Sequence, residues 1–366
     1  MDKFLIKNAK LVDGKVIDIL VKDGHIENIS SFIEMDENID VIELDEDCYI
    51  SAGWIDSHTH CFEKFELYAD NCEEIGYRQG VTSVIDAGTA GADNIEEFFN
   101  SIKECKTHVY SLLNISKTGI CAQNELADMT HIDKKAFEKM CKKFPRFILG
   151  AKVRMSQSVV GENGDLPLYE AIQMANQVNL PLMVHIGTAP AQLETVLKNV
   201  REGDIVTHIF NPKENGIVSH GKIKDCVFEA YQRGVYFDLG HGTDSFSFDV
   251  LDIANENHIQ VYSISSDIYF RNRHNGPVYN LSTTMSKLLM RGYTLEEVID
   301  SVTRKPAKMF HLDKRGRIEK GCCGDFTIFK VIHENKEVTD STGKKVILSQ
   351  YIQPVAVILR NEYIKL

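Results

Sequence analysis

From residue 49 onward the sequence alternates between short apolar runs and longer segments with the periodicity of an amphipathic helix. This alternation is typical of βα units and of a parallel sheet. Eight apolar runs predict strands, and eight is the number that a closed (β/α)8 barrel requires. The runs cover residues 49–56, 81–87, 109–115, 147–153, 182–185, 205–208, 235–239 and 261–265. Helices are predicted between them at 94–105, 134–143, 167–177, 191–198, 222–233 and 295–301.

The two ends of the chain have a different pattern. Residues 3–32 predict short antiparallel strands with hairpin turns at Asp13-Gly14 and Asp23-Gly24, since glycine tolerates positive φ. Strand signals return at 325–331 and 354–359, with a turn at Asn361-Glu362, and 332–344 is expected to be a surface loop. We therefore expect an α/β protein with a TIM barrel over residues 50–316. A small β-sandwich domain is expected from residues 1–49 and 317–366 together.

Composition excludes several classes of partner. The chain has 41 Lys and Arg against 53 Asp and Glu, and a net charge of −12 opposes binding to a nucleic-acid backbone. No apolar stretch is long enough to span a membrane, and the N-terminus is unlike a signal peptide. Nine cysteines without a CxxC pair suit reduced thiols. We expect a cytoplasmic protein that binds a small molecule and that could form homo-oligomers.

His58 and His60 form an HxH pair at the end of the first predicted barrel strand. Residues i and i+2 of a strand point to the same face, so both imidazoles are expected at the barrel mouth. Two imidazoles placed in this way can share one metal ion, and a histidine-rich site favours zinc over magnesium or calcium.

Three further strand ends carry residues that can bind a metal. His185 and His208 end the runs 182–185 and 205–208, and Asp267 follows the run 261–265. The carboxyl ends of barrel strands converge on one face, where the active sites of barrel enzymes lie. Each histidine alone could equally be a hydrogen-bonded core residue, but the set together predicts a metal centre.

Lys152 lies at the end of the apolar run 147–153, where a buried ammonium is costly unless it is paired or neutralised. It could extend to solvent or pair with an acid. Alternatively, it could lose its proton and become a metal ligand.

Together these residues resemble the amidohydrolase superfamily, and in particular its binuclear branch of dihydroorotases, hydantoinases and deacetylase-like hydrolases. The resemblance spans the chain. Residues 316–326 match the C-terminal pattern G-x-I-x-x-G-x-x-A-D-hydrophobic, with Gly324 in place of the usual alanine. Dihydroorotases carry HxHxR, and Phe62 stands here in place of that arginine, which argues against dihydroorotase activity itself.

The resemblance implies a (β/α)8 hydrolase with two divalent ions, most readily Zn²⁺, bridged by a carbamate that forms from carbon dioxide and Lys152. It also implies which residues hold which ion. His58, His60 and Asp267 would hold the more buried ion, and His185 and His208 the more exposed one. A hydroxide between the ions would be the nucleophile, and Asp267 would be the general acid/base.

The predicted function is hydrolysis of an N-acyl or O-acyl bond in a small molecule that carries a carboxylate. The acyl group is expected to be acetyl. The alternative is a cyclic amide hydrolase of dihydroorotase or hydantoinase type. Arg154, His241, Asp244 and Asn275 are candidates for substrate binding, because each lies near a predicted strand end. Arg154 could instead support a metal ligand, and the turn around His241 and Asp244 could simply be a tight βα connection.

Overall fold

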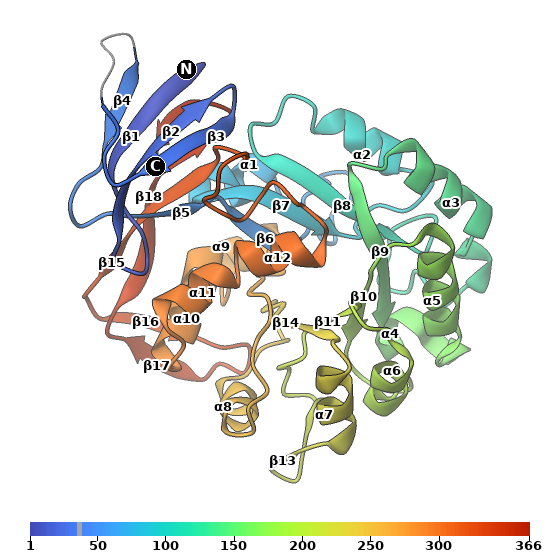
Figure 1. Cartoon of the computed structure of the whole chain (residues 1–366). Helices are drawn as coiled ribbons and strands as arrows, with labels where there is room; N and C mark the ends of the chain where they lie inside the picture. Colours follow the sequence, from blue (N-terminus) through green and yellow to red (C-terminus); the bar gives the residue numbers. More distant parts are fainter. Residues whose placement is uncertain (35–38) are drawn as a thin grey trace.

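The computed structural model describes residues 1–34 and 39–366 (Figure 1). At its centre is a curled parallel sheet of seven strands that follow one another in chain order. Most of these strands are buried on both faces, and this explains why they read as continuous apolar runs. The strands are β6 (Trp54–Thr59), β7 (Val81–Ala87), β8 (His108–Asn114), β9 (Ile148–Met155), β10 (Leu182–Ile186), β11 (Ile205–Thr207) and β14 (Tyr236–Asp238).

The segment 261–268 lies between the two edges of this sheet. The predicted strand 261–265 does not form as a regular strand. Instead, Ser263 pairs with Asp238 of β14, and Ile268 pairs with Thr59 of β6, through isolated parallel bridges. The hydroxyls of Ser263 and Ser265 donate to the Asp238 carboxylate at 2.5 and 2.7 Å, in addition to backbone hydrogen bonds between this segment and residues 237–241. Beyond them, the φ of 50° at Asp267 ends the extended conformation.

Helices cover the outside of the curled sheet (Figure 1). All six predicted helices are present, and α3 has the predicted bounds because the Asp133 side chain caps its first turn. They are α2 (Ile95–Ser101), α3 (Lys134–Lys143), α5 (Leu166–Val178), α6 (Leu193–Asn199), α7 (Asp225–Gln232) and α11 (Leu295–Asp300). The structure adds α1 (Cys72–Ile75), α4 (Gln157–Val160), α8 (Phe248–Glu256), α9 (Phe270–Asn275), α10 (Leu281–Met290) and α12 (Arg304–Met309).

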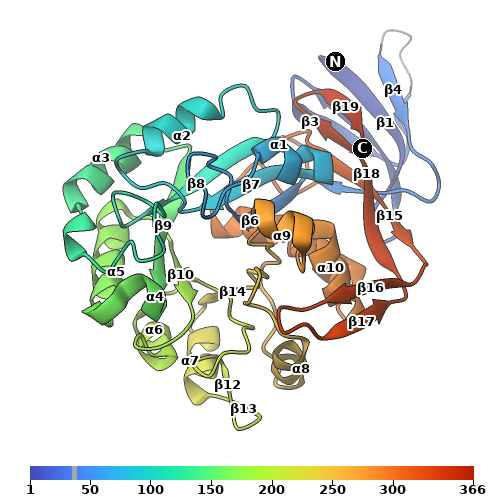
Figure 2. The ribbon, with the colours of Figure 1, turned by 180° about the vertical axis from the view of Figure 1, so that it is seen from behind.

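The two chain ends meet in a pair of four-stranded sheets (Figure 2). One sheet has the order β3 (His25–Ser30), β2 (Val16–Lys22), β1 (Lys3–Lys10) and β4 (Asp40–Glu43). The other has the order β19 (Glu362–Lys365), β18 (Tyr351–Leu359), β15 (Phe326–Ile332) and β5 (Tyr49–Ala52). One buried apolar cluster contains side chains of both sheets, for example Phe4, Ile19, Phe326 and Ile358. The predicted turns at Asp13-Gly14 and Asp23-Gly24 connect β1 to β2 and β2 to β3, and the turn between β18 and β19 lies at Arg360-Asn361, one residue earlier than predicted.

The predicted strand 49–56 is two strands in two different sheets. β5 pairs antiparallel with β15, and β6 begins at Trp54 in the parallel sheet. Residues 50–52, which the sequence placed at the start of the barrel, therefore pair with the C-terminal sheet. A change of sheet within one apolar run leaves no mark on the apolar pattern.

Gly324 packs against the N-terminal sheet. A Cβ at this position would lie 2.6 Å from Cγ1 of Val21 in β2. This contact explains why glycine stands here in place of alanine.

The predicted surface segment 332–344 is largely exposed, but the prediction that it is a loop is wrong. β16 (Lys336–Thr339) and β17 (Lys345–Leu348) form an antiparallel hairpin whose tip reaches the turns that follow β14 (Figure 2). The Ser341 backbone N–H donates to the Phe246 carbonyl at 3.0 Å, and the buried Asp340 carboxylate accepts from the backbone N–H of Phe248 at 3.0 Å. Residues 333–337 and 342–344 are exposed, while these contacts bury Asp340 at the tip.

None of the helices in the described part of the chain is both long and apolar enough to cross a membrane. All nine cysteines lie within the described residues and are free thiols, as the sequence predicted.

Candidate metal centre

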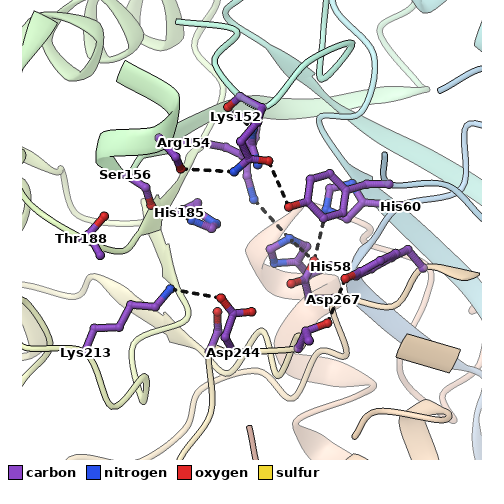
Figure 3. A pocket seen from close by; sticks show the side chains of 16 residues that line it. His58, His60, Lys152, Arg154, Ser156, His185, Thr188, Lys213, Asp244 and Asp267 are labelled. Atoms are coloured by element: carbon purple, nitrogen blue, oxygen red, sulfur yellow. Dashed lines mark hydrogen bonds and ion pairs between the residues drawn. The ribbon is translucent and has the colours of Figure 1, made fainter. Parts of the chain in front are cut away.

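A cavity of about 280 Å³ opens at the carboxyl ends of the parallel strands (Figure 3). His58 lies in β6, Lys152 in β9 and His185 in β10, while His60, His208 and Asp267 follow directly after strands or the bridging segment. The structure thus brings the six residues together from five separate parts of the chain. All of them line the cavity except His208, which is buried beside the His185 ring with ring centroids 4.4 Å apart.

His58, His60 and Asp267 converge on one point. Oδ1 of Asp267 lies 3.3 Å from Nε2 of His58 and 3.2 Å from Nε2 of His60. One atom from each of the three side chains lies within 4.8 Å of the other two. This is the spacing that a single cation between them requires.

Hydroxyl groups orient both of these histidines. Nδ1 of His58 lies 2.9 Å from Oγ1 of Thr207, which in turn donates to the buried Asp238 carboxylate at 2.7 Å. The Thr207 oxygen is therefore the acceptor toward His58, so Nε2 of His58 keeps its lone pair. Nδ1 of His60 is held in the same way, 2.7 Å from Oγ1 of Thr89. Contacts of this kind fix the tautomer and the ring orientation of metal-binding histidines.

Lys152 is fully buried at the base of the cavity. Its Nζ lies 3.3 Å from Nε2 of His58 and 3.3 Å from the sulfur of Met183. Burial lowers the pKa of Lys152 to about 7. A lysine in these surroundings exposes a neutral amine to the cavity far more readily than a lysine at the surface does.

His185 and His208 form a second pair of imidazoles. His208 donates from Nδ1 to the Gly240 carbonyl at 2.6 Å, which leaves its Nε2 unprotonated. That Nε2 is buried and has no hydrogen-bond partner among the described residues. Burial lowers the pKa of His208 to about 4 and that of His185 well below its ordinary value. Both rings are therefore neutral near pH 7, as metal binding requires.

This set of donors fits divalent cations. It contains four imidazoles, one carboxylate and one buried amine. Three of the imidazoles contact hydroxyls, and one donates to a carbonyl. The orphaned Nε2 of His208 is the type of buried polar atom that a metal ion would satisfy. Nitrogen and carboxylate ligands of this kind suit zinc.

The Asp267 carboxylate is ionised in spite of its burial. Burial raises its pKa, but the hydrogen bond with His60 and the nearby Lys152 outweigh this effect and lower the pKa below its ordinary value. Gly242 leaves room for the other oxygen, because a Cβ on Gly242 would lie 2.5 Å from Oδ2 of Asp267. The carboxylate can therefore both bind a cation and accept a proton.

The structure separates the four residues predicted to bind substrate. Arg154 and Asp244 line the cavity. His241 is fully buried and does not line it, since its Nε2 accepts from Nζ of Lys287 at 2.7 Å. Asn275 is exposed at the end of α9, outside the cavity lining.

Sequence reasoning missed most of the remaining cavity wall. Apart from Ser158 in α4, the missed residues lie outside helices and strands, and the full set is Tyr68, Gln123, Ser156, Ser158, Thr188, Lys213, Thr243, Ser245 and Tyr269. The one signal that could have identified some of them is position, because Ser156 and Thr188 come within two residues of the ends of β9 and β10.

Comparisons with known proteins agree on one family. The model of the amidohydrolase family matches residues 49–353. A curated deacetylase from Enterococcus faecalis is 47% identical over 362 residues, which cover 98% of this chain and 98% of that protein. A solved structure described as an adenine deaminase is 45% identical with a TM-score of 0.98 and covers 100% of both chains. Another, described as a dihydroorotase, is 32% identical with a TM-score of 0.91 and covers 100% of this chain and 99% of that chain.

Proposed function

The chain belongs to the amidohydrolase family and is a hydrolase that acts on C–N bonds, and on this basis we propose that it is a two-metal deacetylase. The bond cleaved joins an acyl group, acetyl in the first instance, to nitrogen or oxygen in a small molecule that carries a carboxylate. The observation that carries this proposal is the convergence of His58, His60 and Asp267 beside the buried Lys152. The curated deacetylase, which is similar over almost the whole chain, supports the acyl specificity.

We propose that six residues hold two zinc ions. His58, His60 and Asp267 would hold one ion, and His185 and His208 the other. Lys152, converted to a carbamate by carbon dioxide, would contribute to both. The orphaned Nε2 of His208 supports this assignment. When bound, the two ions supply a hydroxide at neutral pH and polarise the carbonyl that is attacked.

The chain's own groups would do the remaining work. In this proposal the Asp267 carboxylate accepts the proton of the attacking water and delivers it to the leaving nitrogen or oxygen. Thr207 and Thr89 keep the two imidazoles of the HxH pair in their tautomers. Tyr68 and Tyr269, whose ring centroids lie 5.0 Å apart, wall the cavity on the side of Asp267 and limit the access of bulk water.

The size of the cavity supports a small substrate. A volume of about 280 Å³ is at the lower end of the range of ligand sites. The wall is formed mainly by hydroxyl, amide and charged side chains, which suit a polar molecule.

We also propose that the curled sheet is a (β/α)8 barrel in which segment 261–268 takes the position of the eighth strand. The isolated bridges to β14 and β6 support this closure. The two sheets at the chain ends would form a β-sandwich domain, and their shared apolar cluster supports it. The boundary between the two units would lie at Gly53, between β5 and β6, rather than before residue 50.

Two measurements on the purified protein test the function. Elemental analysis should find about two zinc ions per chain, as expected for a two-metal site. A panel of N-acetyl amino acids and O-acetyl hydroxy acids should then release acetate, while dihydroorotate, hydantoin and adenine should remain intact. Ring opening of dihydroorotate or hydantoin without release of acetate would replace the deacetylase by the cyclic amide hydrolase. Release of ammonia from adenine would contradict both.

A further inference from the structure

Three of the described residues that line the cavity carry a cationic side chain, namely Lys152, Arg154 and Lys213. Lys152 lies at the base, against His58. A substrate that carries a carboxylate needs a cation that is both accessible and not already neutralised. Arg154 and Lys213 are the two candidates.

Arg154 is already neutralised. Its Nε and Nη2 donate to the two oxygens of Glu125, each at 2.7 Å, and Nη2 also donates to the Gln123 carbonyl at 3.0 Å. Both partners of this bidentate pair are buried. A substrate carboxylate would have to break the pair and leave Glu125 without a counterion in the interior, which is strongly unfavourable. Arg154 therefore builds the cavity wall.

Lys213 is much less committed. It lies in a different part of the cavity wall from Arg154 (Figure 3). Its side chain is 25% exposed, and its Nζ lies 3.8 Å from Oδ2 of Asp244, beyond hydrogen-bond distance. The Asp244 side chain is 75% exposed, so water can replace the lysine as its partner. An incoming carboxylate can take Lys213 from this loose pair at little cost.

The backbone at Lys213 is fixed relative to the metal centre. The N–H of Lys213 donates to Oδ1 of Asn211 at 3.0 Å, and Nδ2 of Asn211 donates to the carbonyl of His208 at 2.7 Å. The carbonyl of Lys213 accepts from the N–H of Gly216 at 2.8 Å. The turn therefore fixes the backbone of Lys213 at a set distance from the imidazoles. A residue that selects substrates must be fixed in this way.

We propose that Lys213 is the residue that recognises the substrate carboxylate, and that the substrates are acyl derivatives of amino acids or hydroxy acids. This inference rests on the proposed function. The carboxylate of the leaving group binds Lys213 while the acyl carbonyl lies at the base of the cavity. Asp244 competes for the same ammonium and so disfavours substrates with a second negative charge at this position.

The test compares two substrates that differ in one charge, N-acetylalanine and N-acetylalaninamide, each as both enantiomers. The proteins are the wild type, Lys213→Met, Lys213→Arg and the matched control Lys222→Met, which removes an exposed lysine of β13 (Lys222–Ile223). We expect Lys213→Met to raise KM for N-acetylalanine by about 10- to 100-fold, the usual loss for a hydrogen bond to a charged group. KM for the amide should not change. Lys213→Arg should restore most of the preference, and Lys222→Met should behave as wild type.

Asp244→Asn gives a second and opposite change. Without the competing acid, the Kd of N-acetylalanine should fall. An increase in that Kd would contradict the role assigned to the pair.

Calorimetric titration of the metal-loaded wild type and Lys213→Met with the same two compounds separates this inference from the proposed function. Suppose that neither compound is hydrolysed, but that the wild type binds N-acetylalanine more tightly than N-acetylalaninamide and Lys213→Met does not. The deacetylase proposal then fails, and the role of Lys213 stands. If Lys213→Met keeps the preference for the carboxylate, or if the wild type has none in turnover or in binding, the inference is overturned.

Discussion

Asp267 adopts a φ of 50°, in the left-handed region, as does His208 with a φ of 65°. Such conformations cost about 1–3 kcal/mol in residues other than glycine and persist where the surroundings enforce them. At Asp267 the surroundings are Ser266, whose hydroxyl donates to the buried Asp56, and Asn272, whose amide donates to the Asp267 carbonyl at 2.9 Å. The strained backbone directs the carboxylate at both histidines of the HxH pair.

Asp267→Asn should therefore separate chemistry from folding. The amide has almost the same shape but cannot accept a proton, so kcat for the best acyl substrate should fall by about 10²- to 10⁴-fold. The melting temperature should change little. Stopped assays of acetate release, a thermal melt and a metal count check these outcomes, and Asp249→Asn on the exposed face of α8 is the control. Turnover close to that of the wild type would remove Asp267 from the mechanism.

Gly242 supports Asp267 in a way that a methyl group should disrupt. In Gly242→Ala the new Cβ would meet Oδ2 of Asp267 at 2.5 Å, and φ is +54°. Gly203→Ala is a matched control, because φ is +81° there and nothing lies within 4 Å. Both variants should lose about 1 kcal/mol of stability from the backbone. Gly242→Ala alone should also lose activity or metal, and equal activity of the two variants would contradict the supporting role.

The positions of the six candidate ligands could be predicted because each follows from local rules. His58 and His60 share a face by strand alternation, and His185 and His208 follow apolar runs. Partnerships across loops could not be predicted in this way. Glu125 neutralises Arg154 from 29 residues earlier in the chain, and Lys287 reaches His241 from 46 residues later. No periodicity encodes such pairs, so the charge state of the cavity wall required the structure.

At the scale of elements, α10 places a charged residue in the interior. Lys287 is fully buried, and its Nζ donates to Nε2 of His241 at 2.7 Å and to the Pro277 carbonyl at 2.9 Å. His241 in turn donates from Nδ1 to the carbonyl of Gly242 at 2.9 Å. The hydroxyl of Ser341, at the tip of the β16–β17 hairpin, lies 3.2 Å from the same carbonyl. Helix and hairpin thus support the turn that carries Gly242.

The pKa of Lys287 gives this support a dependence on pH. Burial lowers that pKa from 10.5 to about 7. Between these values the unfolded chain binds a proton that the folded chain does not, so the folded wild type becomes more stable as the pH rises. The free energy of unfolding of the wild type should therefore increase relative to Lys287→Met between pH 7 and pH 10.5, by on the order of a few kcal/mol. Urea unfolding at several pH values measures the difference, and parallel curves would contradict the lowered pKa.

Elements with a regular pattern were predicted more accurately than those defined by contacts. β7 and α3 have the predicted bounds, since each combines an apolar pattern with clear signals at its ends. The β16–β17 hairpin was missed because each of its strands has only four residues and is largely exposed, so neither strand gives a clear alternating pattern. α10 was missed because its Ser, Thr and Lys side chains are buried among other elements, which the sequence does not reveal.

At the scale of the whole molecule, Asp325 joins the sheets of the chain ends to the parallel sheet. Its carboxylate accepts from Nη1 of Arg315 at 2.6 Å, lies 3.0 Å from Nε2 of His108 in β8, and accepts from the backbone N–H of Arg360 at 3.1 Å. Arg315 also donates to the hydroxyl of Tyr110 at 2.9 Å. This cluster explains the aspartate of the C-terminal pattern as a structural residue, far in sequence from the metal centre.

Asp325→Asn should lower the free energy of unfolding by about 3 kcal/mol at pH 7, since it breaks a buried pair and leaves Arg315 without its counterion.

The hydrogen bond to His108 and the charges of His108 and Arg315 outweigh burial and hold the pKa of Asp325 well below its ordinary value of 3.8. A depressed carboxyl pKa gives stability that is complete above the pKa of the unfolded chain and is lost as the pH falls below it. The deficit of the variant should therefore shrink between about pH 5 and pH 2. Asp300→Asn, which removes the partner of the mostly exposed Arg304, should cost at most about 1 kcal/mol. Unfolding of metal-free proteins measures these values without the contribution of the metal ligands, and a deficit that stayed constant down to pH 2 would show that the charge of Asp325 does not stabilise the junction.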